Sequence, residues 1–258
     1  MSPYIAFARA FAGSILVASL VAGCAGFTRD SRMLDVDGLH NAILADNVEY
    51  VQGLIMSRSA SVNEPIPAPG YPQGTPLITI AARSASLEVM RYLISAGADV
   101  NARTPAGETA LMLASFFFKE DRERDALSYE QHEAAVRMLV EAGADIENDP
   151  HHYTPLAYAA YQGRDRTVRF LLERGARVDA DTQDGMTYIN TPLMMAAIQG
   201  HHITALWLLL AGADPRIRVH QGHTAAEFAQ KYNHSNLFRM LKCAESLAPG
   251  EAFAAKCE

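Results

Sequence analysis

The hydrophobic residues of this chain recur in short helical patterns that come in pairs. Residues 156–162 and 167–173 form one pair, and residues 193–199 and 203–210 form the next. Within each segment the apolar side chains return at the three- and four-residue spacing of an amphipathic helix. This pattern predicts an all-α chain assembled from helix-turn-helix units.

The same polar residues stand at the start of each predicted pair of helices. Thr-Pro-Leu begins at Thr75, Thr154 and Thr191, and related triplets begin at Thr109 and Thr224, at intervals of 34, 45, 37 and 33 residues. A threonine before a helix can cap its free N–H groups, and proline suits the first turn because it has no N–H to satisfy. A period of this length is typical of a solenoid.

Small residues mark the turns and the expected helix contacts. Gly163 and Gly200 fall between the two helices of a unit, in a turn that favours positive φ, and Gly175 and Gly212 follow the second helix, where a left-handed residue ends it. Residues 159–160 and 196–197 are alanine pairs, which let neighbouring helices approach closely.

Taken together, these landmarks resemble the ankyrin repeat, whose pattern runs Thr-Pro-Leu-His-x-Ala-Ala, Gly-His, Leu-Leu-Leu and Gly-Ala-Asp. The resemblance covers residues 37–241 and implies an ankyrin-repeat solenoid of about six units with extended finger loops. The remaining segments are assigned as a signal peptide (1–23), a tether (24–36) and a C-terminal cap (242–258). An insertion at about residues 118–130 interrupts the third unit, and it is expected to be a loop, as is the long finger at 181–190.

The first residues predict an export signal. Arg9 precedes an apolar run over residues 10–22, which is shorter than the roughly 20 residues of a membrane-spanning helix but typical of a signal peptide. The run ends in Val-Ala-Gly-Cys24, which resembles the lipobox of bacterial lipoproteins and implies a lipid on Cys24. Ala25 then points to the outer membrane, with the protein facing the periplasm. The alternative is an ordinary signal peptide with an unrelated cysteine.

The other two cysteines, Cys243 and Cys257, lie near the end of the chain. Because the export signal implies an oxidising compartment, we expect them to form a disulfide. Closing a loop of about 15 residues with a disulfide stabilises a protein by roughly 3 kcal/mol in the chain-entropy treatment. Two free thiols or a bridge to another molecule are the alternatives.

Composition excludes several functions. The net charge of −7 argues against a nucleic-acid partner, because phosphates are neutralised by clustered Lys and Arg. Of nine histidines, His40 and His201 fit the ankyrin pattern as structural residues, and the others show no ligand spacing, so no metal is expected. No phosphate-binding loop or nucleophile motif is present, so neither a cofactor nor an enzymatic activity is expected.

The candidate binding residues are partly aromatic and lie where an ankyrin unit presents its inner helix and finger to a partner. Large aromatic side chains dominate the energetics of protein interfaces. An alternative for residues 116–118, three consecutive phenylalanines, is that they pack inward and anchor the inserted loop. The predicted partner-binding residues are Phe116, Phe117, Tyr153, Tyr161, Gln162, Met186, Tyr188, Ile198 and Gln199.

The resemblance implies recognition of another protein. The first expectation is a lipoprotein that captures and inhibits its partner, such as an immunity protein against a toxin or lipase. The second is a scaffold or maturation factor for an envelope or periplasmic enzyme, for example in peroxide defence.

Overall fold

The computed structural model describes residues 36–57, 61–65, 71–116, 125–147, 153–179, 191–218, 222–248 and 253–257. The chain divides into two compact units, Met1–Met33 and Leu34–Glu258. The first unit lies outside the described residues, and with it the predicted signal peptide and Cys24.

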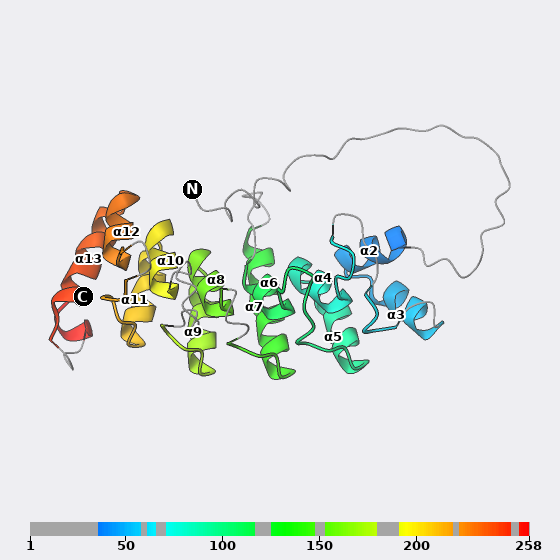
Figure 1. Ribbon diagram of the computed structural model, residues 1–258. Helices are drawn as coiled ribbons and strands as arrows, with labels where there is room; N and C mark the ends of the chain where they lie inside the picture. The colour runs from blue at the N-terminus through cyan, green and yellow to red at the C-terminus, as the bar shows by residue number, and fades with distance from the viewer. Residues whose placement is uncertain are drawn as a thin grey trace, which may run out of the picture. The chain divides into compact units, whose positions relative to one another are not determined.

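The described residues form six consecutive pairs of α-helices (Figure 1), which confirms the predicted all-α solenoid of about six units. Within these residues the single β feature is an isolated bridge between Arg103 and Thr109. The pairs are α2 (Val36–Leu44) with α3 (Val48–Met56), α4 (Leu77–Ser84) with α5 (Leu87–Ser95), α6 (Ala110–Ser115) with α7 (Asp125–Glu141), α8 (Pro155–Tyr161) with α9 (Asp165–Glu173), α10 (Pro192–Gln199) with α11 (His202–Leu210), and α12 (Ala225–Lys231) with α13 (Ser235–Ser246).

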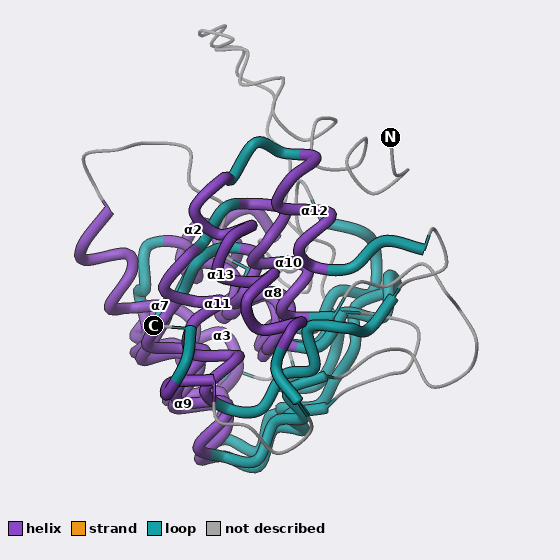
Figure 2. The backbone as a smooth tube through the Cα atoms, turned by 90° about the vertical axis from the view of Figure 1, so that its left-hand side faces the viewer, coloured by secondary structure: helices purple, strands orange, loops and turns teal. Residues whose placement is uncertain are grey.

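The helices stack in two layers (Figure 2), with the first helix of each pair in an inner layer and the second in an outer layer. Each inner helix packs against the inner helices of the units before and after it. Ala159, Ala160, Ala196 and Ala197 are fully buried in these contacts. The predicted role of the alanine pairs is therefore confirmed.

Threonine caps begin four of the inner helices. The Oγ1 atoms of Thr154 and Thr191 accept from backbone N–H groups at 3.2 and 3.3 Å, each followed by a proline in the first turn. Thr75 does not cap α4, because its hydroxyl donates instead to the carbonyl oxygen of Pro72 at 2.7 Å. The capping prediction holds at Thr154 and Thr191 and is wrong at Thr75.

A histidine ties the turn of one unit to the next. The Nε2 atom of His201 lies 3.0 Å from the Tyr161 carbonyl oxygen, and the Nε2 atom of His234 lies 3.2 Å from that of Ile198. Because a carbonyl can only accept, each Nε2 carries the proton and donates. The ring of His201 rests against Gly163, whose φ is +66°, so this glycine is needed both for its backbone conformation and for its missing Cβ.

A second row of contacts runs along the bases of the fingers. Asn63, Asn101, Glu147 and Asp179 occupy equivalent positions, and each side chain accepts from a backbone N–H of the following unit. These bonds join Asn63 to Asp99 (2.8 Å), Asn101 to Asp145 (2.8 Å), Glu147 to Arg177 (2.7 Å) and Asp179 to Asp214 (3.1 Å). Arg177 replaces the aspartate found in the other three units, and its Nε forms an ion pair of 2.7 Å with Glu147. The departure from the pattern is thus compensated across the unit boundary.

The insertion in the third unit is not entirely a loop. Helix α7 begins at Asp125, so the prediction of a loop is wrong for residues 125–130. These residues extend the outer helix, which is why α7 has 17 residues where α5, α9 and α11 have 9. The long finger at 181–190 lies outside the described residues.

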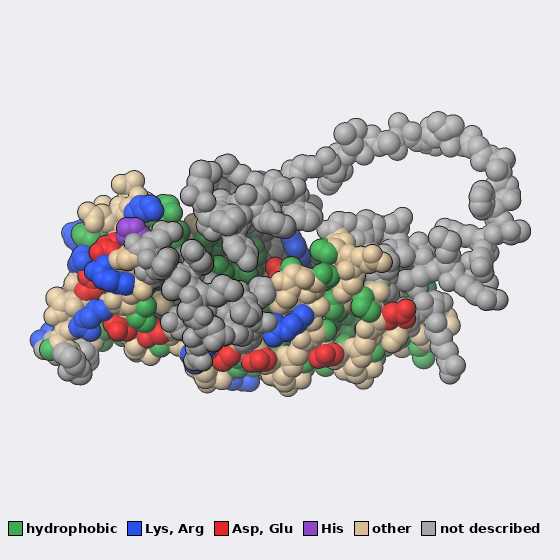
Figure 3. Space-filling view, in the orientation of Figure 1, with side chains coloured by type: hydrophobic (Ala, Val, Ile, Leu, Met, Phe, Trp, Pro, Cys, Tyr) green, Lys and Arg blue, Asp and Glu red, His purple; other side chains and the backbone are tan. Residues whose placement is uncertain are grey.

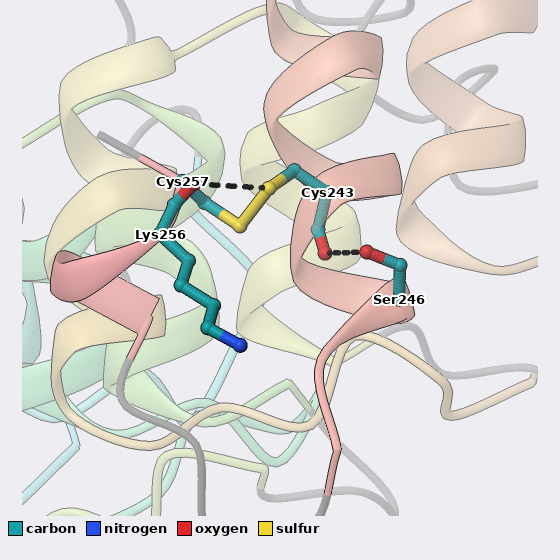
Figure 4. Close-up of a disulfide and its surroundings, with 4 residues drawn as sticks. All are labelled: Cys243, Ser246, Lys256 and Cys257. Carbon is teal, nitrogen blue, oxygen red and sulfur yellow. Dashed lines mark hydrogen bonds between the residues drawn. A yellow bond between two sulfur atoms is a disulfide. The ribbon is translucent and has the colours of Figure 1, made fainter.

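The C-terminal segment folds back on the last units. Helix α13 continues to Ser246, past the predicted end of the repeats at residue 241. Cys243 and Cys257 are joined by a disulfide with a Cα–Cα distance of 5.7 Å (Figure 4). The short 3-10 helix η1 (Phe253–Ala255) contacts α11, and Phe253 is buried there. The disulfide therefore holds an apolar side chain against the outer layer.

Candidate functional site

Four aromatic side chains meet at the boundary between the third and fourth units. The ring centroids of Phe116 and Tyr158 lie 4.9 Å apart at an interplanar angle of 60°, and those of Tyr153 and Tyr158 lie 5.8 Å apart at 70°. Phe116 also stands 6.3 Å from Tyr161. All four rings are half-buried, and edge-to-face contacts of this kind are favourable. We call these four residues the aromatic cluster.

Helix α8 positions three members of this cluster. Its cap at Thr154 fixes where the helix begins, directly after Tyr153. Ala159 and Ala160 face the neighbouring inner helices and are fully buried, so Tyr158 and Tyr161, one turn apart, share the opposite side. Phe116 reaches them as the C-terminal cap of α6. The short helix α6 therefore ends where its last side chain can stack on the next unit.

Equivalent positions in all six units continue this surface. In five units the residue lies two positions before the left-handed residue that joins the two helices. In the third unit it is Phe116, which stands as far after its threonine cap, Thr109, as Tyr161 stands after Thr154. We call them the inner row: Leu44, Arg83, Phe116, Tyr161, Ile198 and Lys231. Leu44 is 47% exposed, and none of the six is buried. Each inner helix therefore leaves a partly exposed side chain at or near its C-terminal end.

The predicted binding residues fall into two groups. Ring contacts bring Phe116, Tyr153 and Tyr161 together through Tyr158. All the predicted residues that the structure describes are half-buried or exposed and lie at the ends of inner helices: Phe116, Tyr153, Tyr161, Gln162, Ile198 and Gln199. Phe117, Met186 and Tyr188 lie outside the described residues. Phe116 supports both hypotheses for the phenylalanines, since it packs against tyrosines and still keeps part of its surface exposed.

Tyr158 belongs to the site but was not predicted from the sequence. Its equivalents Leu113, Met195 and Phe228 are buried, so its position in the repeat suggests a core residue. The signal that identifies it is its spacing of three residues from Tyr161, which places both rings on one side of a helix.

Two half-buried polar contacts hold this part of the backbone in place. Burial lowers the pKa of His201 below its ordinary value, and its hydrogen bond to the Tyr161 carbonyl opposes that shift. The imidazole is therefore neutral at neutral pH and donates to the carbonyl of a cluster residue. Burial raises the pKa of Tyr129, whose hydroxyl donates to the Gly163 carbonyl at 3.3 Å while Arg164 stacks on its ring at 4.2 Å.

The described residues offer little for bound ions or membrane insertion. A shallow, open depression of about 530 Å³ lies at the last unit, but Arg218 and Glu227 within it pair with each other at 3.2 Å. No group of three His, Cys, Asp or Glu side chains in the described part of the chain is placed to hold a metal ion. Nor is any described helix long and apolar enough to cross a membrane.

Comparison with known proteins returns the same repeat. The sequence model of ankyrin repeats in three copies matches residues 39–123 and 125–184, and that of a single ankyrin repeat matches residues 189–219. The chain is 35% identical over 156 residues to ankyrin repeat and SOCS box protein 16 of Homo sapiens, covering 60% of this chain and 32% of that protein. It is 44% identical over 90 residues to palmitoyltransferase Hip14 of Drosophila melanogaster, covering 34% of this chain and 14% of that protein.

These relatives are similar only in part, since the chain spans a third or less of the length of these two proteins. The match to the palmitoyltransferase is confined to ankyrin repeats and carries no catalytic part of that protein over. Ankyrin repeats generally act as non-enzymatic modules for protein–protein interaction. The helix pairs, the caps and the matched residues, which cover more than half of the sequence, lead to one conclusion: this chain belongs to the ankyrin-repeat family.

Proposed function

We propose that this protein captures a partner protein on the inner row and the aromatic cluster, without catalysing a reaction. The observation that carries the proposal is the cluster itself. Four rings gather on one side of the inner layer, and each keeps part of its surface exposed. Tyrosine and phenylalanine in such clusters supply much of the binding energy of protein interfaces.

The backbone beneath the cluster is well suited to binding. Hydrogen bonds from His201 and Tyr129 hold the end of α8, and caps and buried alanines fix its beginning. A surface held in this way loses little conformational entropy when a partner binds. The proposal therefore predicts binding by a preformed surface, with small changes in the helices.

We further propose that the protein acts at the periplasmic side of the bacterial outer membrane, anchored through a lipid on Cys24. The apolar run before Cys24 supports this location, and a disulfide between Cys243 and Cys257 suits an oxidising compartment. In that setting a binding protein without enzymatic chemistry is suited to inhibition in a one-to-one complex, as an immunity protein inhibits a toxin or lipase. A scaffold or maturation factor would use the same surface but preserve or raise its partner's activity.

The test begins with affinity capture from envelope extracts of the source cells, followed by titration with the purified partner. Tyr161→Ala should weaken binding at least about tenfold, roughly 1.4 kcal/mol. Tyr92→Ala on the outer helix α5 is the matched control, because Tyr92 is also a half-buried tyrosine, and this change should leave the dissociation constant nearly unchanged.

The partner's own activity then separates the two roles. Loss of activity at a one-to-one ratio supports inhibition, whereas unchanged or increased activity supports the scaffold. If Tyr92→Ala is disruptive and Tyr161→Ala is silent, the inner surface is not the binding site.

A further inference from the structure

The inner row carries two charged residues, and both are basic. Arg83 lies in the last turn of α4 in the second unit, and Lys231 ends α12 in the last. Both side chains are exposed. Between them lie the aromatic cluster and Ile198, so the row has an apolar centre with a cation on each side.

Arg83 and Lys231 differ from most other described basic residues in lacking a carboxylate partner. Within the described part of the chain, Arg83 lies 5.9 Å from the ring of Tyr71, Lys231 lies 6.0 Å from that of Tyr232, and neither forms an ion pair. Most described arginines and lysines elsewhere do form one, namely Arg91, Arg137, Arg166, Arg174, Arg177, Arg216, Arg218 and Lys242.

The described acidic residues lie at other positions than the inner row. The chain has a net charge of −7, yet the inner row contains no Asp or Glu. Figure 3 shows acidic side chains along the lower edge of the array and also at its α12 end, where the acid of the inner helix, Glu227, is paired with Arg218 at 3.2 Å. A carboxylate that a partner brings to an exposed cation fixes the register of the complex and speeds its formation. Both cations are therefore positioned to pair with carboxylates that the described part of the chain does not supply to them.

We propose that the partner presents to the inner row a segment with an apolar or aromatic centre and a carboxylate on each side. This inference rests on the proposed function and specifies its partner. The apolar centre packs on Phe116, Tyr158 and Tyr161 and supplies most of the affinity. The two carboxylates pair with Arg83 and Lys231, and they fix the position of the segment along the row and speed its association.

A random peptide library displayed on phage, selected on the full chain with its disulfide intact, tests this directly. Clones that also bind the Tyr161→Ala variant are removed, so that the remaining peptides use the inner row. These peptides are then synthesised, and their affinities are measured by fluorescence anisotropy at low and at high salt.

We expect the selected peptides to carry Asp or Glu on both sides of an apolar centre. Arg83→Glu and Lys231→Glu should each weaken binding about tenfold or more at low salt and less at high salt, because screening weakens exposed ion pairs. Arg239→Glu is the matched control, since Arg239 is exposed on the outer helix α13 and bonds only to the amide of Asn236. It should change affinity less than twofold, a small difference by the tenfold scale of 1.4 kcal/mol.

Two results would overturn the inference in different ways. In the first, the selected peptides depend on Tyr161 but show no preference for Asp or Glu, or they bind both charge-reversal variants as tightly as the unchanged protein. This result refutes the proposal of an acidic partner segment and leaves the proposed function intact. A selection that yields no peptide dependent on Tyr161 argues against the inner row as a binding surface and removes both proposals together. Circular dichroism of each variant establishes that it is folded.

Discussion

Gly163→Ala should destabilise the array by more than the usual cost of alanine at a positive φ. A Cβ atom at this position would lie 2.6 Å from Nδ1 and 2.7 Å from Cε1 of His201. The ring cannot simply turn away, because its Nε2 donates to the Tyr161 carbonyl at 3.0 Å. The substitution therefore forces either a shift of the backbone or the loss of that hydrogen bond.

The magnitude follows from two contributions. Alanine in the left-handed region costs roughly 1–2 kcal/mol. Losing the His201 bond adds about 1 kcal/mol, and more if the Tyr161 carbonyl is left without a partner. We therefore expect Gly163→Ala to lower the free energy of unfolding by about 2–4 kcal/mol.

Gly175→Ala provides the control. Its φ is +91°, and a Cβ there would have no heavy atom within 4 Å, so this variant bears only the backbone cost. Any stabilisation from a less flexible unfolded chain applies to both variants and cancels in the comparison. Gly163→Ala should consequently be the less stable of the two.

Urea denaturation, monitored by circular dichroism and by tryptophan fluorescence, measures the free energy of unfolding of both glycine variants. Trp207 is the single tryptophan and lies on α11, in the same unit as His201, so its emission reports the affected region. His201→Ala combined with Gly163→Ala removes the clash, and the double variant should be more stable than the sum of the single effects by about 0.5 kcal/mol or more. Equal losses for the two glycine variants, or strict additivity in the cycle, would refute the steric argument.

Four further outcomes are expected. Cys24→Ser should abolish labelling by a fatty acid analogue and release the protein from membranes, and an unlabelled wild-type protein would contradict the lipid anchor. Ala197→Leu should overpack the contact between inner helices and lower the unfolding free energy by about 1–3 kcal/mol in denaturant titrations. Non-reducing digestion and mass spectrometry should recover the linked peptides of Cys243 and Cys257, and free thiols at both would remove the bond. Burial holds the pKa of His201 below its unfolded value near 6.5, so the unfolded chain takes up the proton first as the pH falls. The urea midpoint should therefore stay constant above about pH 6.5 and decrease at lower pH. The charge of Asp165 opposes this lowering of the pKa, whereas the charges of Arg164 and His234 reinforce it.

The sequence alone predicted the features that depend on local chemistry. Capping by Thr154 and Thr191, the turn at Gly163 and the buried alanines each follow from a few neighbouring residues repeated at a regular interval. Repetition made these predictions reliable, because one unit's pattern corroborates the next.

The remaining features depend on residues that are distant in the sequence. Nothing near Arg177 shows that it pairs with Glu147, because the two meet only across a unit boundary. Helix α7 exceeds the repeat pattern because its extra turns belong to an insertion without a counterpart in other units. That no described carboxylate pairs with Arg83 likewise becomes visible only when the neighbouring units are in place.

The position of the aromatic cluster has a mechanical consequence. Helix α6 has 6 residues and α8 has 7, and the contact between Phe116 and Tyr158 spans the boundary between their units. Arrays of this kind are held together by contacts between neighbouring units. A partner that binds both rings would therefore add contacts across this boundary, and it would raise the resistance of the third and fourth units to unfolding while it is bound.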